Sequence, residues 1–254
     1  MLKYTKHIVK ELCEIVRRPI LRACSGALTR RAAALVTEIK REGFVVLPEH
    51  WSPAQCDIAK TAIDRLCTQV GLENSWVDEL RSDHRFFRGE KHAVELLPFK
   101  DDPLIEEVRR GYTGRREAET FVLAARLDFR AGNKGSGGGW HLDSPHSRQF
   151  KAILYLSDCD TENGPFELIP KTHKRGTLLR FLVNGMRKPE QYRFTDAEVS
   201  PIVVGGYPTK TFTGSRGTLI LVDVTALHRG TPIQNGSRYA LTLYCGDPKI
   251  GATY

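Results

Sequence analysis

Several features of other protein classes are missing from this chain of 254 residues. No apolar run approaches the ~18–20 residues that a membrane-spanning helix needs. Charges interrupt the apolar residues near the start, which argues against a secretory signal. Six cysteines are present without a CxxC pair, so neither a zinc ribbon nor a thioredoxin-like site is expected. So few cysteines in a chain of this length indicate free thiols, and we expect a cytoplasmic protein.

The positive charge of the chain is concentrated at one end. The net charge is +8, and residues 1–31 hold eight lysines and arginines against two glutamates, which leaves only about +2 for the rest. This distribution indicates a basic N-terminal element on a nearly neutral body, and it argues against nucleic acid as a partner. Residues 3–24 fit an amphipathic helix that either packs on the domain or contacts an anionic membrane surface peripherally.

The first half of the chain predicts mainly helices. We expect one over residues 29–42, a short buried strand over 43–48, and a helix from Pro53 to about Cys67 with Ser52 as its N-cap. Residues 71–118 are polar and mixed, with some helix near 102–110. Residues 1–35 are expected to be a basic helical extension, and residues 36–254 a single domain.

From residue 120 onward the pattern changes to strands. We expect an α+β chain that is mainly β, with a sandwich or barrel whose core strands span about 120–245. A glycine-rich loop covers 131–139, and residues 175–215 interrupt the strands with a helical insert; both are candidate lids. Asn235-Gly236 is typical of a hairpin turn. The strands are expected at residues 121–129, 151–156, 166–169, 217–222 and 239–245.

Three residues in the strand-rich part have the chemistry of a metal site. His141 and Asp143 stand two apart, so in a strand both side chains point to the same face. His228 follows 87 residues after His141 and supplies a third ligand from a distant strand. Two histidines and a carboxylate on one face of an ion form the facial triad of non-haem iron, which leaves positions open for a co-substrate and dioxygen. We therefore predict that these three residues are the catalytic metal ligands.

Arg238 is the candidate for binding the co-substrate. It stands ten residues after His228, at the start of the last strand, where a guanidinium can clamp a carboxylate through two parallel hydrogen bonds. Taken singly, an HxD pair occurs by chance, a lone histidine is more often structural, and an arginine more often forms a surface ion pair. His146 and His173 are rival ligands, and we expect a structural role for His173.

At these residues the sequence resembles the phytanoyl-CoA dioxygenase family. The resemblance spans roughly residues 40–245. It implies a double-stranded β-helix of the jelly-roll or cupin type with helices packed outside. It also implies a dioxygenase of the hydroxylase type that uses iron(II), 2-oxoglutarate and O2 and releases succinate and CO2. The matching stretches are GFVVLPEHWSPAQ, GWHLDS, ENGPFELIPKTHK, GTLILVDVTALHRG and SRYALTLY.

The sequence also departs from the family pattern. Many members have a hydroxyl residue two positions after the last histidine to help hold the co-substrate, whereas this chain has Gly230, and Thr231 is the candidate substitute. Tyr155, on one strand face with Lys151 and Ile153, is a further candidate contact. Halogenases of this fold lack the carboxylate, so Asp143 argues against halogenation.

The substrate is left open by the sequence. The resemblance allows an unidentified small-molecule, acyl or sugar- or lipid-linked compound. The basic, aromatic segment 83–92 is either a solvated loop or a contact for an anionic substrate. A non-catalytic binding module on the same fold is the main alternative. A cupin-type hydrolase or isomerase is less favoured, because such sites more often use HxH, which this chain lacks. The oligomeric state cannot be inferred.

Overall fold

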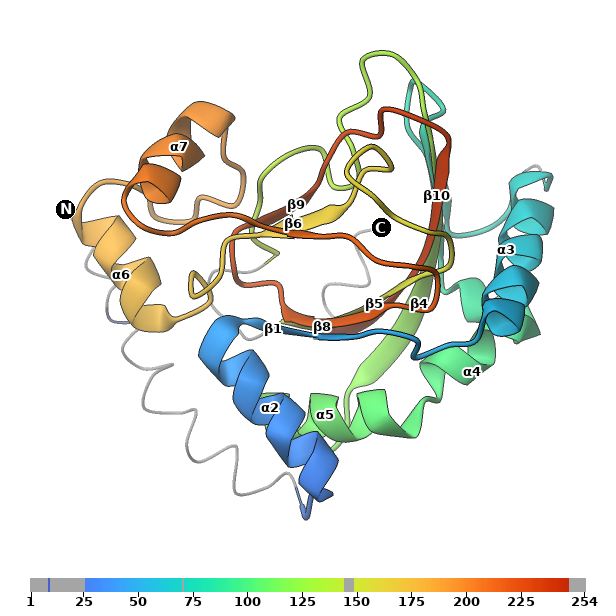
Figure 1. Ribbon diagram of the computed structural model, residues 1–254, viewed down its shortest axis with the longest axis horizontal. Helices are drawn as coiled ribbons and strands as arrows, with labels where there is room; N and C mark the ends of the chain where they lie inside the picture. Colours follow the sequence, from blue (N-terminus) through green and yellow to red (C-terminus); the bar gives the residue numbers. More distant parts are fainter. Residues whose placement is uncertain (1–8, 10–25, 70, 144–148, 247–254) are drawn as a thin grey trace.

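Two antiparallel β-sheets that face each other form the centre of the molecule (Figure 1). The computed structural model describes residues 9, 26–69, 71–143 and 149–246. The large sheet has seven strands in the order β1-β8-β5-β10-β4-β3-β2. Its strands are β1 (Phe44–Leu47), β8 (Leu219–Asp223), β5 (Phe150–Tyr155), β10 (Ser237–Gly246), β4 (Glu119–Asp128), β3 (Asp83–Phe87) and β2 (Ser75–Val77).

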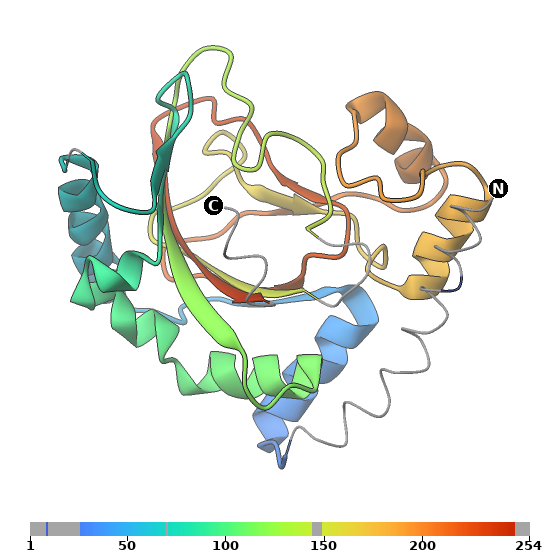
Figure 2. The ribbon, with the colours of Figure 1, turned by 180° about the vertical axis from the view of Figure 1, so that it is seen from behind.

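The small sheet lies opposite the large one (Figure 2). It has the order β7-β6-β9 and consists of β7 (Lys210–Phe212), β6 (Phe166–Leu168) and β9 (His228–Gly230). Isolated bridges extend it beyond β9, because His141 pairs with His228 on one side and with Arg193 on the other. The two facing sheets confirm the predicted double-stranded β-helix.

Strand β5 shows why the core divides into two layers. Its six residues are all buried, as the run of apolar residues predicted. Leu154 belongs to a cluster between the large sheet and the outer helices, whereas Ile153 and Tyr155 belong to a cluster between the two sheets. Alternation along the strand therefore gives the sheet one face for helices and one face for the site.

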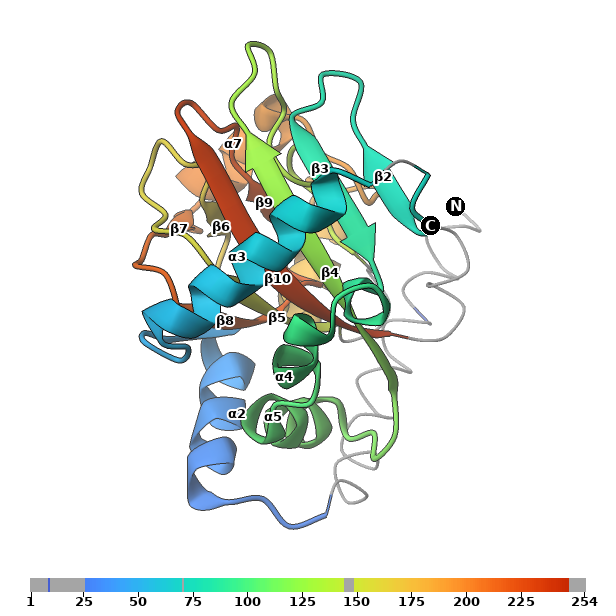
Figure 3. The same ribbon diagram turned by 90° about the vertical axis from the view of Figure 1, so that its right-hand side faces the viewer.

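The helices pack against the outer face of the large sheet (Figures 1 and 3). Thr29 caps α2 and Ser52 forms a capping box with Gln55 at the start of α3, so both helices begin where the sequence predicted. The expected boundary at residue 35 falls within α2, whose buried face belongs to the core. The helices of this layer are α2 (Arg30–Glu42), α3 (Pro53–Cys67), α4 (Leu97–Lys100) and α5 (Pro103–Thr113).

Two expectations need correction. Segment 83–92 is not a solvated loop: residues 83–87 form β3, which pairs with β4, and the 3-10 turns η1 (Gly89–Lys91) and η2 (Val94–Leu96) follow. Asn235-Gly236 does not close a hairpin between adjacent strands. The strand before it, β9, pairs with β6, and the strand after it, β10, pairs with β4 and β5. The turn carries the chain from one sheet to the other.

The predicted insert is helical and lies at one end of the small sheet, with α6 (Arg175–Val183) and α7 (Asp196–Val204) (Figure 1). Among the residues that the structure describes, no helix is long and apolar enough to cross a membrane. The cysteines at 56, 67, 159 and 245 are free. The amphipathic helix expected over 3–24, apart from residue 9, lies outside the described residues, and so does His146.

Candidate metal centre

The predicted triad converges between the two sheets. Oδ1 of Asp143 lies 3.5 Å from Nε2 of His141 and 3.6 Å from Nε2 of His228. One candidate ligand atom from each residue lies within 4.8 Å of the other two. The structure therefore brings together the three residues that the sequence singled out.

Backbone pairing sets this geometry. The amide nitrogens of His141 and His228 each donate to the other residue's carbonyl oxygen, at 2.9 and 3.0 Å, so the two rings stand side by side with centroids 4.1 Å apart. The amide of Asp143 donates to the carbonyl of Val224 at 3.1 Å. Paired residues of antiparallel strands present their side chains on the same face, so both imidazoles reach the same space.

The imidazoles are oriented for metal binding. Nδ1 of His141 lies 2.8 Å from the carbonyl oxygen of Gly139, and Nδ1 of His228 lies 2.9 Å from that of Ala226. A carbonyl oxygen only accepts, so Nδ1 carries the hydrogen in both rings and Nε2 keeps its lone pair. A histidine that ligates a metal commonly donates its other N–H in this way. The donor set therefore fits iron(II).

The protonation states also suit a metal. Burial lowers the pKa of His141 to about 4 and that of His228 to about 3, so both rings are neutral near pH 7. Burial alone would raise the pKa of Asp143, but the ammonium of Lys151 and the two histidines lower it to about 2. The site thus offers two neutral nitrogens and one ionised carboxylate.

Lys151 holds the second oxygen of that carboxylate, a role that the sequence did not reveal. Its Nζ lies 2.5 Å from Oδ2 of Asp143 and 3.9 Å from the centre of the Tyr244 ring. Lys151 stands on β5, directly across from Tyr244 on β10. Because Oδ2 is occupied by the ammonium, Oδ1 is the oxygen that faces the histidines.

The candidate co-substrate residues differ in position. Arg238 is buried in the pocket lining and donates from Nη1 to the carbonyl of Gly164. Tyr155 also lines the pocket, but its hydroxyl donates to the carbonyl of Phe212 at 3.0 Å and accepts from the amide of Phe166 at 2.9 Å. The hydroxyl of Thr231 donates to the carbonyl of Pro165 at 3.2 Å, and Thr231 is not part of the lining.

His173 is buried with Nε2 3.2 Å from the carbonyl of Lys40, which confirms a structural role.

The glycine-rich loop lies against the metal site. A Cβ on Gly137, which has φ +86°, would stand 2.5 Å from Cε1 of His141. The amide of Gly230 donates to the carbonyl of Ser136 at 3.0 Å, and a Cβ on Gly230 would lie 2.8 Å from that oxygen. The departure from the family pattern at Gly230 therefore has a local cause, since the loop occupies the space of a side chain.

The pocket above the triad has a volume of about 140 Å3 and receives residues from both candidate lids. Ser136 and Gly137 come from the glycine-rich loop, and Arg193 comes from the insert. Arg85 on β3 also lines it, with its guanidinium 2.6 Å from Oδ2 of Asp83 and 3.2 Å from the hydroxyl of Ser136. Arg193 was not predicted from the sequence as a site residue, whereas Arg85 belongs to segment 83–92, for which contact with an anionic substrate was one of two interpretations.

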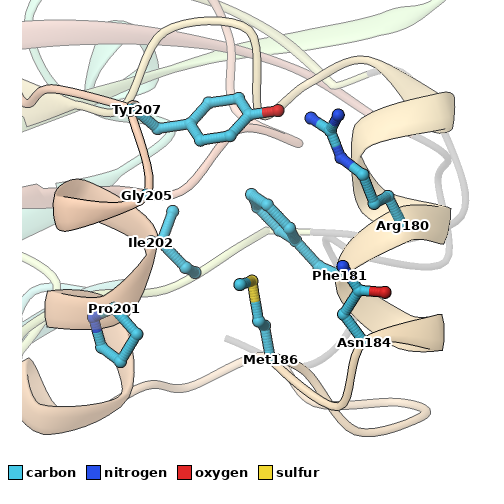
Figure 4. A pocket seen from close by; sticks show the side chains of 9 residues that line it. Arg180, Phe181, Asn184, Met186, Pro201, Ile202, Gly205 and Tyr207 are labelled. Atoms are coloured by element: carbon cyan, nitrogen blue, oxygen red, sulfur yellow. The ribbon is translucent and has the colours of Figure 1, made fainter.

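A second cavity of about 400 Å3 lies between α6 and α7 (Figure 4). Phe181 and Tyr207 meet edge to face there, and Arg180 lies over the Tyr207 ring. Its lining lacks the histidine and carboxylate ligands that the triad pocket has, so the triad pocket is the candidate metal site.

The chain is similar to several known oxygenases. It is 25% identical over 222 residues to an ectoine dioxygenase of Bordetella parapertussis and 26% identical over 220 residues to that of Sphingopyxis alaskensis, covering 78% of this chain and 69% of each relative. Its fold is similar to the epimerase SnoN from nogalamycin biosynthesis, with a TM-score of 0.62 at 15% identity over 85% of this chain and 83% of SnoN. It is also similar to iron-bound EctD from S. alaskensis, with a TM-score of 0.58 at 17% identity over 87% and 77% of the two chains.

The family model for phytanoyl-CoA dioxygenase matches residues 39–240, which is most of the chain. The relatives, this match and the triad agree on one enzyme class, an iron(II)- and 2-oxoglutarate-dependent dioxygenase. The chain belongs to the phytanoyl-CoA dioxygenase family.

Proposed function

We propose that His141, Asp143 and His228 hold the iron and that Arg238 anchors 2-oxoglutarate, for the hydroxylation of a small molecule with release of succinate and CO2. The observation that supports this most strongly is the convergence of Nε2 of His141, Nε2 of His228 and Oδ1 of Asp143 in one pocket. The bound iron and co-substrate supply the activation of dioxygen. The residues of this chain orient these groups and exclude water from them.

Arg238 has unused hydrogen-bonding capacity. Its Nη1 donates to Gly164, whereas its buried Nε has no hydrogen-bond partner within the described structure. A buried guanidinium without a carboxylate is costly, and a bound dianion would supply one. The small side chains of Ala240 and Ala125, paired across β10 and β4, line the same pocket as Arg238. Tyr155 contributes its ring to the wall, because its hydroxyl already joins β6 and β7.

The anchor role is tested by the affinity for 2-oxoglutarate. Replacing Arg238→Gln should weaken binding of 2-oxoglutarate by about 10- to 100-fold, the cost of losing a charged hydrogen-bond partner. Iron binding should stay unchanged, because Arg238 does not contact the triad. Calorimetric titration of the iron-loaded protein under anaerobic conditions measures both constants. Unchanged affinity for 2-oxoglutarate would remove Arg238 from the proposal.

We also propose a role in membrane contact for the basic N-terminal segment. Its excess of lysine and arginine suits peripheral contact with an anionic membrane surface while the enzyme works in the cytoplasm. Because α2 begins at Arg30 and packs in the core, a truncation should end before residue 26. Loss of sedimentation with anionic vesicles in that truncation supports the contact, and equal sedimentation of both forms contradicts it. The division into residues 1–35 and a domain of 36–254 stays a prediction.

A further inference from the structure

Arg193 occupies a special place beside the metal site. Residues 192–194 add to the edge of the small sheet, because the amide of Leu142 donates to the carbonyl of Tyr192 at 2.9 Å and the amide of Phe194 to that of Trp140 at 3.0 Å. Arg193 is thus paired with His141, which is itself paired with His228. Directly paired residues share a face, so Arg193 stands in one row with both histidines and lines the same pocket.

The charges of the pocket are unbalanced. Its lining includes four cationic side chains, Arg85, Lys151, Arg193 and Arg238, and one carboxylate, that of Asp143. Asp83 pairs with Arg85 from behind the lining, and Asp143 pairs with Lys151. Two cations are then left in excess within the described structure. Iron(II) and the 2-oxoglutarate dianion bring equal and opposite charge, so loading the site leaves this excess unchanged.

Arg193 is the cation that the co-substrate does not use. If Arg238 binds the far carboxylate, the remaining guanidinium is that of Arg193, which lies at the edge of the opposite sheet. Its side chain donates to the carbonyl of Gly137, a neutral group, and it forms no ion pair with any carboxylate of the described residues. The side chain is also exposed, so an incoming molecule can reach it.

The rest of the wall is suited to a hydrocarbon. Phe87, Leu123, Ile153 and Val224 line the same pocket as the triad. A ligand that reaches Arg193 with an anionic group can therefore lay an aliphatic part against these side chains, near the metal.

We propose that Arg193 binds the anionic group, a carboxylate or a phosphate, of the primary substrate, whose adjacent aliphatic part lies at the metal. The proposal rests on the proposed function, because it assigns Arg238 to 2-oxoglutarate. A structural role, in which Arg193 only holds the loop through its hydrogen bond to Gly137, makes a different prediction. A displaced loop would weaken the binding of charged and uncharged ligands alike.

The test measures binding to protein loaded anaerobically with iron(II) and 2-oxoglutarate. The probes are a panel of short- and medium-chain aliphatic carboxylic acids and alkyl phosphates, together with the uncharged methyl ester of each acid. Calorimetry compares the wild type with Arg193→Gln, Arg193→Lys and the control Arg31→Gln, which removes an exposed arginine from α2. The visible absorption of the iron–2-oxoglutarate complex is recorded for every variant before probes are added.

We expect at least one anionic probe to bind more tightly than its uncharged counterpart. Arg193→Gln should weaken binding of that probe by about 10- to 100-fold and leave the affinity for the ester unchanged. Arg193→Lys should recover part of the lost affinity, and Arg31→Gln should have no effect. The carboxylate and phosphate arms show which anion is preferred. The proposal is overturned if acid and ester bind with equal affinity, if Arg193→Gln weakens the binding of both equally, or if no probe binds. Absence of the absorption band in the wild type is a failure of the proposed function instead.

Discussion

The two sheets build the two sides of the pocket in different ways. The large sheet places Lys151, Tyr155 and Arg238 through long strands, and β10 alone pairs with β4 over ten residues and with β5 over six. The small sheet places His228 on a strand of three residues, and His141 and Arg193 on isolated bridges. The side of the pocket with Arg238 is therefore part of the folding core, whereas the side with the two histidines depends on a few backbone hydrogen bonds and a glycine-rich loop.

This difference teaches that stability and metal binding are separable. The large sheet has apolar clusters on both faces, so its residues contribute mainly to the free energy of unfolding. The residues around the triad contribute mainly to iron affinity, because they set the positions of the two histidine nitrogens and the Asp143 oxygen. Changes in the apolar core of the large sheet should therefore leave iron binding nearly intact. Lys151 is the exception on this sheet, because it lies on β5 and contacts Asp143 of the triad.

The largest effect on stability is expected for Leu154→Ala in β5. Leu154 is fully buried between the large sheet and the helices, so the substitution should lower the free energy of unfolding by about 2–5 kcal/mol. Iron affinity of the folded fraction should not change. Urea unfolding together with iron titration checks both statements, and weakened iron binding by folded protein would contradict the separation.

Lys151→Met should affect the metal more than the fold. Loss of the ammonium at Oδ2 removes the group that holds Asp143, and a lost partner of this kind commonly costs about 10- to 100-fold in metal affinity. Methionine keeps an unbranched apolar side chain of similar length. Lys151→Arg should restore part of the affinity in the same titration with cobalt(II) or iron(II). An affinity equal to the wild type in Lys151→Met would show that the carboxylate is held without the ammonium.

Gly137→Ala tests the contact of the loop with the metal site. The new Cβ would meet the His141 ring at 2.5 Å, so iron affinity should fall by on the order of 10-fold. Gly132→Ala is the matched control, because Gly132 has nearly the same φ of +83° in the same loop and no atom within 4 Å of a new Cβ. An equal loss of iron affinity in the two variants would mean that backbone strain, and not contact with the His141 ring, causes the loss.

The smallest effect is expected in the outer helices. Asp102 caps α5 through the amide of Ile105 at 2.9 Å and lies 2.9 Å from Nε2 of His50. Asp102→Ala should cost about 1 kcal/mol of unfolding free energy near pH 7. Burial alone would raise the pKa of Asp102, but these hydrogen bonds lower it. The difference between wild type and variant should therefore shrink as the pH falls below the unfolded pKa of about 3.9. A difference that stays constant in urea unfolding at low pH would contradict this.

The sequence predicted what depends on local pattern. Apolar runs marked the strands, Ser52-Pro53 marked the start of α3, and the spacing of His141 and Asp143 placed both side chains on one face. It could not show strand pairing: Asn235-Gly236 is typical of a hairpin turn, yet the strand before it, β9, pairs with β6. Pairing depends on contacts far apart in the sequence, which periodicity does not contain.

The missed site residues have the same physical cause. Arg193 reaches the site only because the insert adds a bridge beside His141, more than 50 residues away along the chain. The sequence put Lys151 on one strand face with Ile153 and Tyr155 but left open which face of that strand lines the barrel, and it gave no sign of the contact with Asp143. Segment 83–87 combines three polar or charged residues with Phe86 and Phe87 and has no regular alternation, so its sequence did not predict the pairing with β4.

The most direct test of the central claim is anaerobic titration of the protein with iron(II) in the presence and absence of 2-oxoglutarate. We predict that one iron binds per chain and that the weak visible charge-transfer band of the chelate develops only when both are present. His141→Ala should lose the band, while its far-ultraviolet circular dichroism stays that of the wild type. Its iron affinity should fall by more than the roughly 10- to 100-fold expected when a group that only holds a ligand in place is removed. A band of wild-type intensity in folded His141→Ala would contradict the assignment of His141, Asp143 and His228 as the iron site.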